Sequence, residues 1–144
     1  MSPNMAAYYF SKIVEGTFDA VVAATSKALS NHGFGVLTDI DVQATLRKKL
    51  DVSFRPYRIL GACNPQMAFR ALQVEDKIGM MLPCNVVVQE SAPGKVEVAA
   101  VDPVASMQAI ENAKLSDTAT AVRKMLRSVI DEVGVARQPT AKAI

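Results

Sequence analysis

Apolar residues recur at helical spacing in two long segments, one near the start of the chain and one near its end. Such a recurrence marks one face of an amphipathic α-helix. The first stripe consists of Phe18, Val21, Val22, Thr25, Leu29 and His32, and the second of Val122, Leu126, Val129, Ile130 and Val133. The pattern predicts two long helices. Thr17 caps the first and Gly33 ends it, while Ser116 caps the second and Gly134 ends it.

Extended segments fill much of the chain between these helices. Runs of β-branched and aromatic residues predict five strands, at 5–14, 34–40, 54–63, 80–91 and 96–101. Asp41, Asn64 and Asp102 each stand at a cap position, before shorter helical segments at 42–50, 65–74 and 103–112. A turn at 92–95 joins the last two strands as a hairpin, which makes them antiparallel.

This order of elements distinguishes between two sheet architectures. A doubly wound parallel sheet needs a crossover helix after every strand, and the hairpin rules that out. The sequence therefore predicts an α+β fold: an antiparallel β-sheet with two long helices packed on one face and two or three additional short helices. We expect one α+β domain over residues 1–135 and a frayed C-terminal tail over 136–144.

Composition narrows the functional classes. The 144 residues are 50% apolar and 21% charged, with a net charge of +2, which is globular and argues against a dedicated nucleic-acid binder. No apolar run approaches the roughly 20 residues of a membrane span, and we see no secretory signal.

Two cysteines in a chain of this size suggest reduced thiols and a cytoplasmic location. We find no Gly-rich phosphate loop, nucleophile elbow or metalloprotease helix, and we expect no cofactor.

The stretch between residues 55 and 88 carries the candidate chemistry. Cys63 ends one predicted strand and Cys84 begins the next, and an asparagine follows each of them, Asn64 and Asn85. If the two strands are antiparallel neighbours, both cysteines lie at the same end of the sheet; if parallel, they lie at opposite ends.

Three interpretations of the cysteine pair remain open. Both can be small buried hydrophobes. They can form a ligand-binding or soft-metal site, although a four-coordinate zinc site needs two more ligands. They can also cycle between dithiol and disulfide, with Cys63 activated by the helix that follows it. Asn64 fits a helix cap and Asn85 a backbone-pairing side chain, or both can contact a ligand.

A second group of polar residues offers a pocket on the sheet. Arg55 and Tyr57 lie two positions apart and share a side of their strand, and with Asp39 and Glu90 they can line a polar pocket. Ion pairs across the strand face explain these residues almost as well. Asp39 and Asp41 can form a carboxylate pair only if the strand continues through Asp41, which fits a helix cap better.

Three ordered strings connect the chain to a known family: GFGVLTDIDV at 33–42, FRPYRILGACNP at 54–65 and LPCNVVV at 82–88, with Gly79 between the last two. The chain resembles the bacterial and archaeal family called domain of unknown function 302. The resemblance implies a TATA-binding-protein-like α+β fold and a homodimer, and it implies no established activity. A shared fold does not carry DNA binding with it.

These observations favour a non-enzymatic module that acts as a homodimer and binds a small ligand or a partner near Cys63 and Cys84. One alternative is a thiol-dependent redox or metal-sensing protein that uses the two cysteines. Another is a purely structural dimerisation module, which would show a large apolar contact surface.

Overall fold

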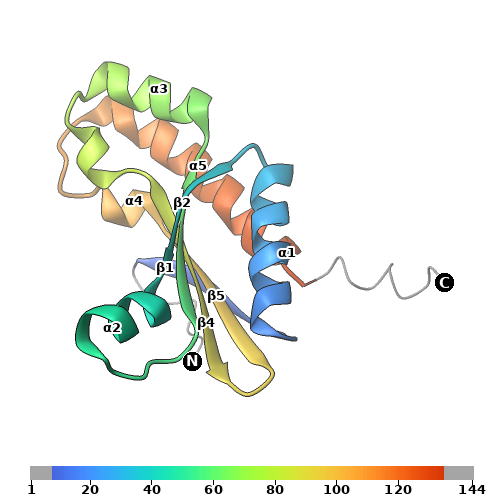
Figure 1. Cartoon of the computed structure of the whole chain (residues 1–144). Helices are drawn as coiled ribbons and strands as arrows, with labels where there is room; N and C mark the ends of the chain where they lie inside the picture. The colour runs from blue at the N-terminus through green and yellow to red at the C-terminus, as the bar shows by residue number, and fades with distance from the viewer. Residues whose placement is uncertain (1–7, 135–144) are drawn as a thin grey trace.

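The computed structural model describes residues 8–134. The start of the first predicted strand, at 5–7, and the predicted tail at 136–144 lie outside the described residues. Five strands form one sheet in the order β1-β5-β4-β3-β2 (Figure 1), and every neighbouring pair is antiparallel. The strands are β1 (Tyr9–Glu15), β2 (Gly35–Asp41), β3 (Tyr57–Cys63), β4 (Cys84–Ala92) and β5 (Lys95–Val101). The predicted α+β class with an antiparallel sheet is confirmed.

Two long helices, α1 (Phe18–Asn31) and α5 (Ala113–Glu132), pack against each other and against one face of this sheet. The described residues also contain three shorter helices, α2 (Val42–Leu50), α3 (Pro65–Val74) and α4 (Pro103–Ser106), and a 3-10 turn, η2 (Ile78–Met81). Every member of the predicted α5 stripe is buried. The stripe meets a layer of valines from β4 and β5 that is fully buried: Val86, Val88, Val96 and Val98.

Polar contacts fix the C-terminal end of α5. The Lys12 ammonium group on β1 donates to the carbonyl oxygens of Asp131 and Val133, both at 2.8 Å. These carbonyls have no partner within the helix, and a cation at this end also suits the helix dipole. Glu132 accepts from Asn31 Nδ2 at 2.6 Å and pairs with His32 Nε2 at 2.8 Å. The end of α5 is therefore tied to β1 and to the end of α1.

Most of the predicted caps are confirmed. Thr17, Asp41, Asn64 and Asp102 each accept a hydrogen bond from the first turn of the following helix. The prediction for Ser116 is wrong, because α5 begins at Ala113 and Asn112 caps it. Asn112 Nδ2 also donates to the carbonyl of Val74 at 2.7 Å, a contact to the end of α3 that no local pattern reveals.

Three other boundaries also differ from the prediction. The fourth strand begins at Cys84 rather than at position 80, because Met80 and Met81 belong to η2. The third begins at Tyr57 rather than at position 54. The short helix after Asp102 ends at Ser106, well before position 112.

Gly61 sits where β2, β3 and the segment before β4 approach one another. A Cβ atom at this position would overlap Thr38 Oγ1 and lie 2.7 Å from Cγ of the Pro83 ring. We predict that Gly61→Ala lowers the free energy of unfolding by about 1–3 kcal/mol, the usual cost of an overpacked site. Urea denaturation measures this loss. Gly35→Ala, at a β2 position with open space around the new Cβ, is the control and should change stability far less. Equal stabilities for the two variants would contradict the close packing at Gly61.

Glu132 supplies a pH-dependent contribution to stability. Hydrogen bonds from Asn31 and then from His32 hold the pKa of this carboxylate below its ordinary value. A lowered folded-state pKa means that the contribution is present above the unfolded pKa, about 4.3, and is lost as pH falls through the folded value. We predict that the stability difference between wild type and Glu132→Gln narrows between about pH 5 and about pH 3. Thermal denaturation of both proteins across this range checks the prediction, and a constant difference would contradict it.

Candidate functional site

The two cysteines lie at the same end of the sheet. Strands β3 and β4 are antiparallel neighbours, and Ala62 stands directly opposite Cys84 in their register. The order of strands therefore brings together the two positions that the sequence left unplaced. Successive strand residues point to opposite faces, so Cys84 shares a face with Ala62, and Cys63 points to the other face. Both cysteines are free thiols; Cys84 is buried and Cys63 is partly exposed.

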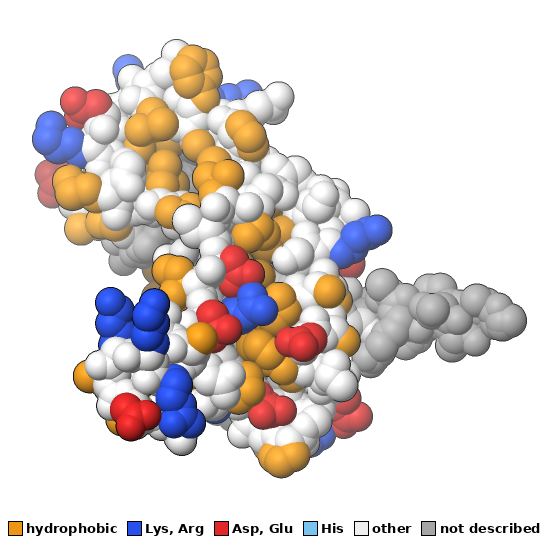
Figure 2. All heavy atoms as spheres, viewed as in Figure 1, with side chains coloured by type: hydrophobic (Ala, Val, Ile, Leu, Met, Phe, Trp, Pro, Cys, Tyr) orange, Lys and Arg blue, Asp and Glu red, His pale blue; other side chains and the backbone are white. Residues whose placement is uncertain are grey.

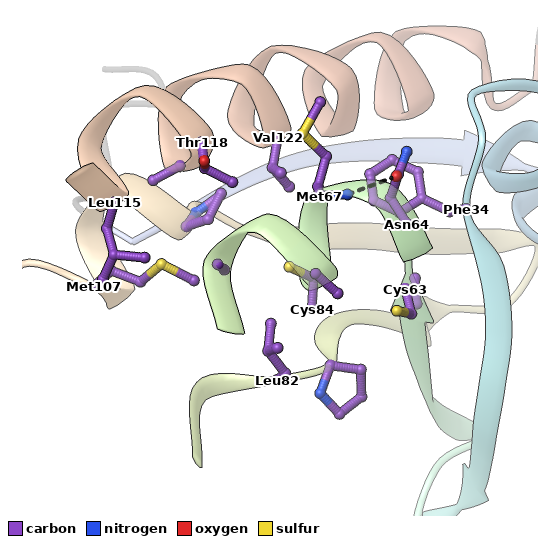
Figure 3. Close-up of a pocket in the computed structure, with 16 residues that line it drawn as sticks. Phe34, Cys63, Asn64, Met67, Leu82, Cys84, Met107, Leu115, Thr118 and Val122 are labelled. Atoms are coloured by element: carbon purple, nitrogen blue, oxygen red, sulfur yellow. Dashed lines mark hydrogen bonds between the residues drawn. The ribbon is translucent and has the colours of Figure 1, made fainter. Parts of the chain in front are cut away.

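A narrow pocket opens beside them, between this end of the sheet and helices α3 and α5 (Figure 3). Figure 3 draws its 16 lining residues as sticks. Apart from the two thiols, Asn64 and Thr118 are the only lining residues with polar side chains. The apolar walls come mainly from Phe34, Met67, Leu82, Met107, Leu115 and Val122. We call this space the α3/α5 pocket.

The α3/α5 pocket lies between two hydrophobic clusters. Phe34, Cys84 and Val122 belong to the main core under α1 and α5. Leu115, together with the flanking Leu82 and Met107, belongs to a smaller cluster around Ala71 and Ile78. The empty space measures about 460 Å³ including its opening, but the part that can hold the centre of a water-sized sphere is only about 30 Å³. The pocket is thus a thin apolar slot where two cores meet.

Asn64 is held in place by its role as a cap. Its side-chain oxygen accepts from the backbone N–H of Met67 at 3.2 Å, and this contact caps the start of α3 at the wall of the pocket (Figure 3). The prediction of a cap at Asn64 is confirmed. Asn85 does not join the pocket, because it points to the other face of the sheet, opposite Gly61, where it is exposed.

The chemistry of Cys84 is set by its burial. Loss of solvent and, to a smaller extent, the neighbouring Cys63 together raise the pKa of the Cys84 thiol to about 11. A thiol with this pKa is almost entirely protonated near neutral pH and is a poor nucleophile and a poor metal ligand. Among residues 8–134, no group of three or more His, Cys, Asp or Glu side chains is arranged to hold a metal ion.

The predicted polar pocket of Asp39, Arg55, Tyr57 and Glu90 is divided between the two faces of the sheet. Tyr57 pairs with Gln89 on one face, and Asp39 lies on the other. Asp39 instead pairs with Arg58 at 2.6 Å, which raises the pKa of the guanidinium group.

Arg55 remains close to Tyr57, as predicted. Its guanidinium carbon lies 5.6 Å from the centroid of the Tyr57 ring, and its Nε donates to Gln89 Oε1 at 2.8 Å. Glu90 stands opposite Val96, on the face that the long helices cover. The single pocket expected from spacing along the strands therefore does not form, because the sheet register separates its members.

Sequence reasoning missed most of the residues that line the α3/α5 pocket. Met67 stands on α3, Thr118 stands on α5 and Met107 directly follows α4, and no spacing along the chain connects them. The only local signal is the cap at Asn64, which places the helix that carries Ala68 and Ala71 on the pocket.

Comparisons with known proteins agree with this architecture. A family model described as "Domain of unknown function DUF302" matches residues 10–133. A solved structure from Bacillus stearothermophilus, titled as an uncharacterized conserved protein DUF302, superposes with a TM-score of 0.82 at 27% sequence identity. The match covers 89% of this chain and 99% of that one. No curated protein matches the chain. Within residues 8–134, no helix is long and apolar enough to cross a bilayer.

The two thiols should differ strongly in reactivity. With a pKa of about 11, Cys84 is only about one-thousandth thiolate at pH 8, and it is also buried. We predict that native protein reacts with a disulfide reagent at one thiol, and that Cys63→Ser removes this phase while Cys84→Ser leaves it in place. Stopped-flow thiol titration measures the number of reactive thiols and their rates in wild type and in both variants. Unfolded protein is the control, in which two thiols should react. Two equally fast native thiols would contradict the buried environment of Cys84.

Proposed function

The chain belongs to the DUF302 family, and the description of this family names no activity. From the geometry of the site we propose that the protein is a module that binds small apolar ligands in the α3/α5 pocket. One observation carries the proposal: the pocket has almost entirely apolar walls and only two polar side chains, Asn64 and Thr118. Small-molecule sites typically combine such walls with a few polar groups that orient the ligand. We place this activity in the cytoplasm, in keeping with two free thiols.

The shape of the pocket indicates the kind of ligand. Its interior is too thin for a bulky ring system, so the proposed ligand is a hydrocarbon chain or the edge of a single ring. Met67 and Met107 line opposite parts of the slot. Methionine side chains are unbranched and flexible, and they adapt to irregular apolar shapes. Movement of these two side chains would widen the slot for a chain without unfolding either core.

The surface near the pocket supports an apolar ligand as well. Figure 2 shows hydrophobic side chains gathered over α3, at the top of the view. Phe69 and Leu72 on α3 and Met80 and Met81 on η2 are all exposed. Scattered exposed apolar residues are common, but four on two adjacent elements form a patch. A ligand with an apolar end would find a favourable surface here before it enters the slot.

The thiol-dependent alternative is less well supported. A disulfide between Cys63 and Cys84 requires side chains that point toward each other, and strand alternation directs them to opposite faces. Attack by Cys84 requires a thiolate, and burial disfavours that form. The described geometry therefore favours a packing role for Cys84 as a wall of the pocket.

We test the proposal with a straight-chain fluorescent probe, the polyene fatty acid cis-parinaric acid, and with decanoate as a straight-chain competitor. We predict that the probe binds the native protein with enhanced emission and that decanoate displaces it. Ala68→Leu places a larger side chain at the pocket wall and should weaken probe binding at least about tenfold, since it removes space that the ligand needs.

Ala23→Leu is the matched control, because Ala23 is an exposed alanine on α1. This variant should bind the probe as wild type does. Circular dichroism confirms that both variants are folded. No emission change with the native protein, or equal binding by Ala68→Leu and Ala23→Leu, would overturn the proposed site.

A further inference from the structure

A second cavity adjoins the α3/α5 pocket on the side of α4. It lies between α4, the connection at 107–112 and the first two turns of α5. Its empty space measures about 480 Å³ including the opening, and about 190 Å³ of this can hold the centre of a water-sized sphere. The corresponding part of the α3/α5 pocket is about 30 Å³. The second cavity, which we call the α4/α5 chamber, is therefore wide where the slot is thin.

The slot and the chamber have three lining residues in common, Met107, Leu115 and Ala119. The side chains of these residues therefore separate the two spaces. In Figure 3, Met107 and Leu115 lie at the opposite end of the slot from Phe34 and Cys63, so the chamber extends the slot at this end. Leu115 and Ala119 are buried on α5, whereas Met107 is only half-buried and directly follows α4. Because a methionine side chain is unbranched and flexible, rotation of Met107 would connect the two spaces.

The chamber differs from the slot in the polar groups that line it. Three of its lining residues have polar side chains: Gln108, Asn112 and Ser116. The Asn112 side chain is already engaged, because its Oδ1 accepts from the backbone N–H of Lys114 at 3.0 Å and its Nδ2 donates to the carbonyl of Val74. Gln108 and Ser116 are exposed, and neither side chain has a hydrogen-bond partner among residues 8–134. An amide and a hydroxyl group can each donate and accept, so both are available to a ligand.

Neither space is lined by charge. Of the described residues that line the slot or the chamber, none is Asp, Glu, Lys or Arg. Removing an ionised group from water is costly unless a charge or several hydrogen bonds compensate it. The lining therefore disfavours a carboxylate, phosphate or ammonium group inside the chamber. It favours a neutral group that donates and accepts hydrogen bonds.

We propose that the ligand class of this site is a neutral straight-chain amphiphile, with its hydrocarbon tail in the α3/α5 pocket and its head in the α4/α5 chamber. The inference rests on the function proposed for the α3/α5 pocket and names the ligand of that same site. The thin apolar slot fits a tail, and the wider chamber fits a hydroxyl or primary amide head between Gln108 and Ser116. A few polar groups that orient a ligand against apolar walls are typical of small-molecule sites. A carboxylate head would have to stay in the water at the chamber opening, so fatty acids bind less tightly.

The test compares 1-decanol with decanoate, two ligands of equal chain length, as competitors of bound cis-parinaric acid at about pH 8, where the carboxylate is ionised. We expect wild type to bind 1-decanol at least about tenfold more tightly than decanoate. Ser116→Lys places an ammonium group at the chamber, where it can pair with a carboxylate head. This variant should shift the ratio of the two inhibition constants at least about tenfold towards decanoate, since a hydrogen bond between charged groups contributes that much.

Ser128→Lys is the matched control, because Ser128 is an exposed serine on the same helix and lines neither space. It adds the same net charge and should leave the ratio at the wild-type value. Circular dichroism checks that both variants are folded, and each inhibition constant is corrected for the affinity of that variant for the probe.

Equal or tighter binding of decanoate by wild type would overturn the neutral ligand class. An unchanged ratio in Ser116→Lys, or an equal shift in Ser128→Lys, would overturn the placement of the head in the chamber. Each of these results requires that the probe binds, so each would leave the function proposed for the α3/α5 pocket standing. A native protein that does not bind the probe would instead overturn that function and this inference together.

Discussion

Burial of one face of an antiparallel sheet under α1 and α5 is the constraint on which the other features depend. The four valines of β4 and β5 that carry this contact are completely buried. Side chains alternate along a strand, so a slip of one residue would move all of them to the other face. The cost of exposing that layer fixes the register of β3, β4 and β5. The same register places Cys84 opposite Ala62 and divides Asp39 from Tyr57.

The α3/α5 pocket arises because the chain builds a second, smaller core beside the first. Helix α3 follows β3 without a long connection, and Asn112 ties its last carbonyl to the start of α5. The Asn112 contact thus holds the small cluster around Ile78 against the start of α5. At the boundary between this cluster and the main core, the side chains leave a slot between them. Protein interiors are normally packed as densely as organic crystals. A slot at such a boundary is therefore the place where a ligand can enter with the smallest rearrangement of packed side chains.

Patterns along the chain were enough to locate the features that depend on neighbours a few residues away. Helical stripes located α1 and α5, Thr17, Asp41, Asn64 and Asp102 were recognisable as caps, and the hairpin at 92–95 fixed the antiparallel class. The contacts between side chains of distant segments became visible only in the folded chain. Asn112 replaced Ser116 as the cap of α5, Asp39 paired with Arg58, and Met67 and Met107 came together in one pocket. Caps and stripes are decided within a turn or two of helix, whereas these contacts follow from strand register and helix packing, which the whole core sets at once.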